Sequence, residues 1–404
     1  MSEINVGDLN VSTEFNLPLY NSSNRPVNPA TGFMIFNSTE NKLQVWTGSQ
    51  WKSFGQQNYD ISANGGVVTS DLTGDYSGYR VYRFTGDGTL TVNQSNQDGG
   101  VEFLLIAGGG GGGGVIGGGG GGGGVIYRRE LYLAPGTYNI SIGGGGAGGT
   151  GWNSSQQEGR AGTPSTFTDN AGFSYEAVGG GGGCAHGGSS PNRIAGQGGS
   201  GGGSASVSRR GGNAIGKNFG PQATDKAHNI RDVYLSNNEA MADGDALARG
   251  AQSWEAIETS TNECQGVQGN AGGNRGDGDT GAGGGGFGTN GGTGGAPRDT
   301  GGEGGHGGYF DITGSMVGYA GGGGGGVRGT GRRRGTKAGD YGGGDGGRAT
   351  GAPVNFGSPT PNSAEAGATN RGGGGGGGGY NAPRSGAVGA PGGSGVCIIR
   401  YRKS

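Results

Sequence analysis

Glycine accounts for 112 of the 404 residues, and no other feature of the sequence constrains the fold as strongly. Average glycine usage is roughly 7%, so the excess is about fourfold. Hydrophobic residues make up only 29% of the chain, well below the roughly 45–50% apolar content of a typical globular domain. The composition therefore excludes a large core of packed side chains for most of the sequence.

The glycine-rich part of the sequence repeats with a period of three. Glu303, His306 and Tyr309 are separated by Gly-Gly pairs, and Asn290 and Thr293 have the same spacing. A polyproline-II-type helix has three residues per turn and no internal hydrogen bonds. A Gly-Gly-Xaa repeat in this conformation places every side chain on one edge and bare backbone on the other two. The period thus favours ordered glycine helices over a flexible linker.

Neighbouring helices can supply the hydrogen bonds that each glycine helix lacks. No Cβ keeps their backbones apart, so N–H and C=O groups can pair between helices, as buried backbone groups must. Most of each repeat is glycine and proline is scarce, which favours a flat or hexagonal array over a collagen-like rope. Residues 117–124 and 372–379 carry no side chains, and we expect them in the middle of the array.

Strand-like segments lie on both sides of the glycine-rich part. Each is a short apolar or alternating run, which is typical of β-strands. We predict that the last segment, residues 395–402, pairs with the earlier ones, so that a β-sandwich anchors both ends of the glycine-rich part. The earlier segments are YRVYRF (79–84), GTLTV (88–92), VEFLLI (101–106), VIYRRELYL (125–133) and YNISI (138–142).

These segments divide the chain into three parts, which are an N-terminal β module (1–58), a β-sandwich (59–107, completed by 125–142 and 395–403) and the glycine-rich part (108–394). One stretch of the last part, from Asn213 to Gln265, is poor in glycine. Helix formers such as Glu239 and Leu247 occur in it, so we predict one or two short helices in this insertion.

Several motifs resemble the glycine-rich domain that is common in phage tail proteins. They are VEFLLIA before a glycine run, APGTYNISIG (134–143), GTPSTF (162–167) with AVGGG (177–181), and the ending GSGVCIIRY (393–401). The similarity covers about residues 79–403. Tail-fibre tip adhesins of T-even-type phages carry a polyglycine-helix sandwich whose loops touch the host receptor. The anaplastic lymphoma kinase family combines such helices with a jelly-roll-like domain. The resemblance implies a mainly β fold, with polyglycine II helices inserted into a jelly-roll-like β-sandwich.

The N-terminal part carries a second resemblance. RPVNPATGFMIFN (25–37) and LQVWTGSQW (43–51) are similar to a short β module of phage fibres. Such fibres are generally homotrimers, and the hairpin of the module would bury Trp46 or Trp51. The resemblance implies that residues 1–58 trimerise the chain and attach it to other virion proteins of the tail or baseplate.

Aromatic residues occur where the glycine runs end or break, and we predict that they bind a receptor. Aromatic rings offer a large contact area with few rotatable bonds. The alternative is that they form a small core that caps the ends of the glycine array. The candidates are Trp152, Tyr175, Tyr309, Phe310, Tyr319, Tyr341, Phe356 and Tyr380.

We predict no catalytic residue, cofactor site or metal site. GGNAIGKN (211–218) nearly matches a phosphate-binding loop, but no apolar strand precedes it and Asn218 replaces the required hydroxyl residue. Cys184 and His186 have no second ligand pair at zinc-like spacing. Asp277 and Asp279 fit a solvated turn better than a calcium site. Paired carboxylates can be remote in sequence, so a glycan-cleaving enzyme stays open as a third alternative.

We predict a non-enzymatic virion protein of a bacteriophage, assembled in the cytoplasm of the bacterial host. The net charge of −2 gives no electrostatic footprint for nucleic acid, and no run of about 20 apolar residues could span a membrane. Residues 1–16 lack the regions of a secretion signal. The favoured role is a tail fibre adhesin that binds a host glycan or outer-membrane protein. The alternative is a capsid decoration, head fibre or other structural component.

Overall fold

The computed structural model of the chain describes residues 17–39, 42–54, 59–95, 100–151, 157–169, 174–186, 195–205, 210–214, 268–275, 280–295, 300–328, 341–347, 364–380 and 388–403. Within these ranges the chain is mainly β and has no α-helix. Nearly all of the glycine-poor insertion, including its predicted helices, lies outside them. The chain divides into two compact units, Met1–Gln57 and Asn58–Ser404.

The first unit contains a four-stranded sheet in the order β1-β2-β3-β4. Trp46 and Trp51 face each other across the β3–β4 hairpin, with ring centroids 5.6 Å apart. Trp46 is buried and Trp51 is half-buried. Of the two tryptophans that the hairpin was predicted to bury, Trp46 is therefore the buried one. The strands are β1 (Leu19–Tyr20), β2 (Met34–Asn37), β3 (Lys42–Trp46) and β4 (Trp51–Phe54).

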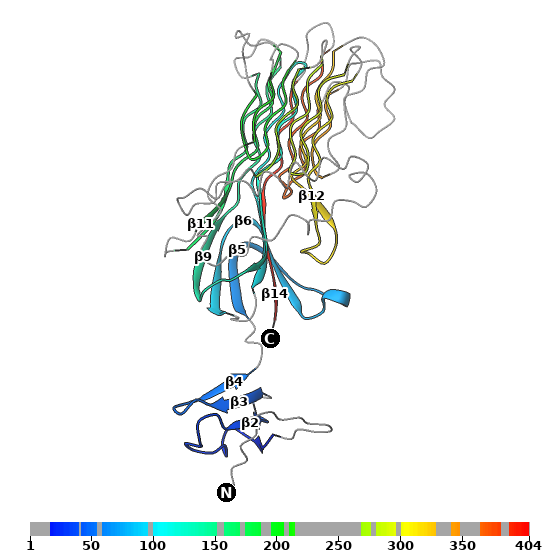
Figure 1. Cartoon of the computed structure of the whole chain (residues 1–404). Helices are drawn as coiled ribbons and strands as arrows, with labels where there is room; N and C mark the ends of the chain where they lie inside the picture. The colour runs from blue at the N-terminus through cyan, green and yellow to red at the C-terminus, as the bar shows by residue number, and fades with distance from the viewer. Residues whose placement is uncertain are drawn as a thin grey trace, which may run out of the picture. The chain divides into compact units, whose positions relative to one another are not determined.

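Eight strands of the second unit form one sheet in the order β11-β10-β9-β6-β14-β7-β8, with β5 paired to β6 beside this path. The last strand, β14, lies between β6 and β7 and is antiparallel to both (Figure 1). This is the pairing predicted for the end of the chain. The strands are β5 (Asp60–Asp71), β6 (Tyr79–Gln94), β7 (Val101–Ile106), β8 (Val125–Leu131), β9 (Gly136–Ser141), β10 (Ser165–Asp169), β11 (Ser174–Ala177) and β14 (Val396–Arg402).

The long hairpin of β5 and β6 divides this sheet into two halves. Residues 79–84 of β6 pair with β14, whereas residues 88–92 pair with β9. The hairpin bends between them, where a Cβ on Gly66 would lie only 2.7 Å from the backbone of Gly86. Gly65 beside it has a φ of +94°, which residues with a side chain rarely adopt. The two segments predicted as separate strands are therefore one bent strand.

The two halves of the sheet face each other across the main hydrophobic core. Phe103 of β7 packs against Phe167 of β10 and Tyr175 of β11, with ring centroids 5.0 and 5.5 Å apart. All three side chains are fully buried. Hydrogen bonds thus join the strands of the predicted sandwich into a single, nearly closed sheet that curls around one core.

A short hairpin covers the outer face of one half of the sheet. Its strands, β12 (Gly308–Phe310) and β13 (Val317–Tyr319), form a two-stranded sheet of their own. Phe310 and Tyr319 pack with Leu104 of β7 and Ile398 of β14 in a second hydrophobic cluster. The hairpin lies where the glycine-rich part meets the sheet (Figure 1).

Glycine-rich segments run side by side away from the sheet and form a bundle, which we call the glycine array (Figure 1). The N–H groups of residues 117–124 donate in turn to three neighbouring segments, and their carbonyl groups accept from three others. Every third residue therefore faces the same neighbour, and this run lies inside the array as predicted. The six neighbours are residues 372–378, 178–184, 282–285, 107–113, 200–203 and 323–326.

Burial in the array follows the same period of three. Within residues 301–309 each Gly-Gly pair is buried, whereas Glu303 and His306 are exposed and Tyr309 is half-buried. Asn290 and Thr293 are exposed as well. The side chains of this repeat are thus the exposed or half-buried positions, as the repeat predicts.

The array has a near end beside β7 and β8 and a far end where the chain turns at Val115 and Ile116. Residues 107–114 lead out from β7 to this turn, and residues 117–124 lead back to β8. Val115 and Ile116 have φ values of +47° and +50°, which β-branched residues disfavour. Both are buried, and Tyr380 packs against them. Burial of these apolar side chains helps to offset the unfavourable turn conformation.

Candidate functional site

The eight aromatic residues predicted to bind a receptor do not form one site. Four of them come together at the near end of the array, which are Tyr309, Phe310, Tyr319 and Tyr341. Tyr175 lies in the sheet core and Tyr380 lies at the far end. Trp152 and Phe356 fall outside the described residues.

The near-end cluster packs the β12–β13 hairpin against its surroundings. The ring centroids of Tyr309 and Tyr341 lie 4.5 Å apart, and those of Phe310 and Tyr319 lie 6.1 Å apart. All but Tyr309 are buried, and so is Tyr175 in the sheet core. Buried rings offer no contact area at the surface of the chain. Their packing agrees with the alternative weighed from the sequence, in which such residues form a small core at an end of the array.

Tyr380 differs because it keeps part of its ring exposed at the far end. The guanidinium carbon of Arg328 lies 5.5 Å from the centroid of this ring, within the range of a cation–π interaction. Arg328 itself is exposed. The far end thus presents an aromatic and a cationic group side by side.

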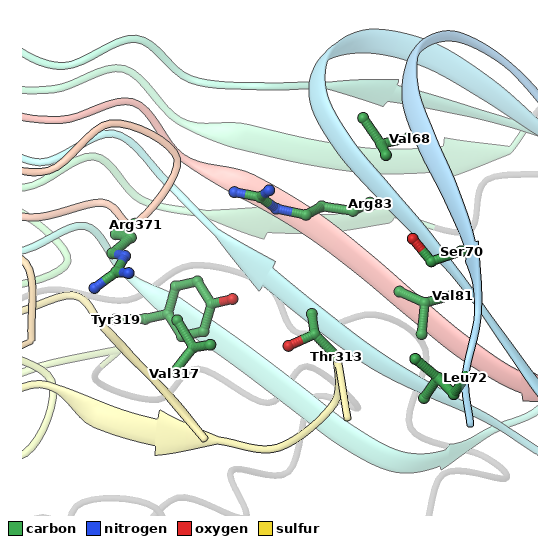
Figure 2. A pocket seen from close by; sticks show the side chains of 9 residues that line it. All are labelled: Val68, Ser70, Leu72, Val81, Arg83, Thr313, Val317, Tyr319 and Arg371. Atoms are coloured by element: carbon green, nitrogen blue, oxygen red, sulfur yellow. The ribbon is translucent and has the colours of Figure 1, made fainter. Parts of the chain in front are cut away.

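A pocket of about 290 Å³ opens where the β12–β13 hairpin meets the outer face of the sheet. Figure 2 shows aliphatic side chains of β5 and β6 at one end of it, and the guanidinium groups of two arginines beside a tyrosine toward the other. The hairpin supplies the wall opposite the sheet. The lining residues are Val68, Ser70, Leu72, Val81, Arg83, Thr313, Val317, Tyr319 and Arg371.

Arg83 and Arg371 have no acidic partner among the described residues. Two other arginines of the same sheet are neutralised. Arg80 Nε lies 2.7 Å from Asp71 Oδ1, and Arg400 pairs with Glu102 of β7. Burial raises the pKa of the Tyr319 hydroxyl, and the charges of Arg83 and Arg371 oppose that rise. Both arginines therefore act electrostatically on the same part of the pocket.

Strand alternation explains why Arg83 faces the pocket. Arg83 and Val81 are two residues apart on β6, so their side chains share one face of the strand. Val81 is buried on this face and Arg83 is half-buried. A charge two residues from an apolar residue was the only sign of this site in the sequence. No pattern in the sequence connects Arg83 with Arg371, which directly precedes the glycine run 372–379.

A largely buried ion pair between Arg400 and Glu102 holds the hairpin next to the pocket. Arg400 Nε donates to Glu102 Oε2 over 2.6 Å, and Arg400 NH1 donates to the Asp311 carbonyl over 3.1 Å. The Tyr127 hydroxyl donates to Glu102 Oε1 over 2.6 Å. Burial raises the pKa of Glu102, while Arg400 and Tyr127 oppose the rise. This network connects β7, β8 and β14 to Asp311, the residue after β12. It therefore positions the nearby Thr313 over the sheet.

Other motifs of the sequence form no site in the described part of the chain. No group of three or more potential metal ligands occurs there. Cys184 is a buried cysteine beside two alanines, and the His186 N–H donates to the Val115 carbonyl. Asp277, Asp279 and the second half of GGNAIGKN lie outside the described residues. No helix of the described residues is both long and apolar enough to cross a membrane.

Residues 84–402 match a family model described as a glycine-rich domain. The match begins within β6 and ends at the last residue of β14. It therefore includes the glycine array and most of the strands that carry it. No curated protein matches the sequence significantly.

Proposed function

Because the chain belongs to the glycine-rich domain family, we propose that it is a non-enzymatic virion protein of a bacteriophage and acts as a tail fibre adhesin. The resemblance of several motifs to phage tail proteins supports the viral context. In this role the first unit attaches the chain to tail or baseplate proteins. The second unit carries the surface that meets a glycan or an outer-membrane protein of the host.

We interpret the glycine array as a bundle of polyglycine II helices. Hydrogen bonds that return to the same neighbour at every third residue support this interpretation. Six bonded neighbours around residues 117–124 favour hexagonal packing over a flat array. The facing halves of the curled sheet favour a jelly-roll-like arrangement, with the bundle inserted after β7. Such a bundle is stiff because its interior has no side chains that could repack.

The adhesin role rests on one observation, which is that the chain returns repeatedly to the far end. Gln157, His186 and Tyr380, which come from three different parts of the sequence, all lie beside the turn at Val115 and Ile116. The Gln157 carbonyl accepts from the Gly114 N–H, the His186 N–H donates to the Val115 carbonyl, and Tyr380 packs against both turn residues. A rigid scaffold that brings several parts of the chain to one end is typical of binding proteins.

Trimerisation through the N-terminal module would bring three copies of the far end to one receptor surface. Linked sites bind with an avidity that exceeds the affinity of each single site. Weak contacts at each far end would therefore be sufficient for firm attachment to a cell.

Immunogold electron microscopy of the intact phage tests the proposal. An antibody raised against residues 213–265 should place gold at the distal tips of the tail fibres. The purified protein should also compete with the phage for adsorption to host cells. Gold over the head or along the tail, together with no competition, would instead support a capsid decoration or head fibre.

A further inference from the structure

Uncompensated positive charge gathers at the pocket between the sheet and the β12–β13 hairpin. Arg83 is half-buried and Arg371 is exposed, and the nine lining residues include no acid. A charge withdrawn from water is costly unless it is paired. Two acids close to Arg83 in the sequence have other partners: Asp71 pairs with Arg80 and Lys403, and Asp87 accepts hydrogen bonds from the Ser141 hydroxyl and the Ile142 N–H. A bound anion would supply the missing partner.

The polar groups of the pocket suit an oxyanion. A guanidinium group can donate two parallel hydrogen bonds to a carboxylate or a phosphate. Ser70, Thr313 and Tyr319 add hydroxyl donors to the two arginines. Figure 2 shows the Tyr319 hydroxyl directed into the space between the hairpin and β6. The arginines and the hydroxyl groups thus line one pocket, with Ser70 toward its aliphatic end and Arg371 toward the other (Figure 2).

The remaining walls indicate that the ligand has more than an anionic group. Val68, Leu72, Val81 and Val317 line the pocket with aliphatic surface, and Val68 is 54% exposed. A volume of about 290 Å³ lies just below the roughly 300–1,000 Å³ of typical small-molecule sites, so the ligand is small. A body the size of one sugar ring, whose C–H groups pack on aliphatic side chains, fits this space.

We infer that this pocket binds a small organic anion, in which a carboxylate or phosphate group is carried on a body the size of a monosaccharide. The oxyanion contacts Arg83 and Arg371, and the apolar face of the ligand lies on the valines and Leu72. The pocket lies near the sheet, away from the far end of the array. The inference therefore stands apart from the adhesin proposal, and either can fail without the other.

Isothermal titration calorimetry of the full chain tests this inference with four probes, which are glucuronate, glucose 6-phosphate, inorganic phosphate and neutral glucose. We expect saturable binding of a sugar anion, at least about tenfold tighter than that of glucose. The two sugar anions distinguish a carboxylate ligand from a phosphate ligand. Added salt should weaken the binding, since it screens charges that are partly exposed. Equal binding of glucose and the anions, or binding of none of the probes, would overturn the inference.

Substitutions at the arginines give the second test. Arg83→Gln and Arg371→Gln should each weaken binding of the sugar anion about tenfold, because each removes one charged donor. Arg80→Gln is the matched control, since it alters the same strand at a guanidinium that pairs with Asp71, and its affinity should equal that of the wild type. Unchanged affinity in both pocket variants would contradict the proposed site. If a variant fails to fold, the salt dependence of the wild type decides the question.

Discussion

The curled sheet and the glycine array are stabilised in opposite ways. In the sheet, Phe103, Leu105 and Phe167 belong to a core that is built from side chains and closed to water. In the array, the interior is backbone, and residues 117–124 are bonded to six neighbouring segments. Removal of a side chain should therefore damage the sheet, whereas addition of one should damage the array.

This difference shows how a chain with few apolar residues can still form an ordered structure. Apolar burial stabilises the sheet by roughly 25 cal/mol per Å². Ordering glycine costs more conformational entropy than ordering any other residue, and each hydrogen bond contributes only about 1 kcal/mol. The array therefore needs many bonds in several directions, and only segments without Cβ atoms approach closely enough to form them.

A methyl group added inside the array should have the largest effect. In Gly121→Ala the new Cβ would overlap the carbonyl oxygen of Ser200, and backbone cannot rotate away as a side chain can. The free energy of unfolding, measured by chemical denaturation, should fall by more than about 4 kcal/mol. In the control, Gly144→Ala, the methyl group lies 3.9 Å from the Thr163 hydroxyl oxygen, and the change should stay within about 0.5 kcal/mol. Similar losses of stability in the two variants would contradict the view that close backbone packing stabilises the interior of the array.

Removal of side-chain volume from the sheet should have the next largest effect. Leu105 is fully buried in the main core, so Leu105→Ala should lower the free energy of unfolding by about 3 kcal/mol. Val68→Ala in the same sheet is the control, because Val68 is largely exposed, and it should change stability by less than about 0.5 kcal/mol. Chemical denaturation of both variants measures the difference. A stable Leu105→Ala protein would show that the array, and not the core, dominates stability.

The loss of the Tyr59 proton at alkaline pH should have the smallest effect, and it should act on the sheet. The buried Tyr59 hydroxyl accepts a hydrogen bond from the Leu133 N–H, and burial raises the pKa of Tyr59 from 10.0 to about 12. The unfolded chain loses this proton at lower pH than the folded chain, so stability falls as pH rises from 10 through 12. By pH 11 this tyrosine should account for a loss of about 1.4 kcal/mol.

The free energy of unfolding at pH 9 and pH 11 measures this loss. Tyr59→Phe removes the titrating group, so the variant should lose about 1.4 kcal/mol less than the wild type between the two values. Residues 117–124 carry no titratable side chain, and the interior of the array should not contribute. An identical pH dependence in the variant would exclude Tyr59 as a cause.

Several elements of the sheet could be predicted because their signals are local. The apolar run at residues 101–106 coincides with β7, and the terminal run at 395–402 closely matches β14. Strand β5 was not predicted because much of it is exposed and polar. Strands β12 and β13 have only three residues each, so they carry little periodicity of their own. Of the nine pocket residues, only Tyr319 had been predicted as a functional residue, and it was predicted for a different role.

The sequence by itself determined the contrast between a side-chain core and a backbone array. Composition and the period of three are properties of residues close together in the chain, and they dictate which segments can pack without Cβ atoms. Only the tertiary structure decided which six segments surround residues 117–124, and which face of β6 the hairpin covers. It also placed Arg371 and Arg83 in the lining of the same pocket. The physical reason is that bare glycine backbones are nearly interchangeable as neighbours, so their order is set by where the sheet and the connecting segments hold their ends.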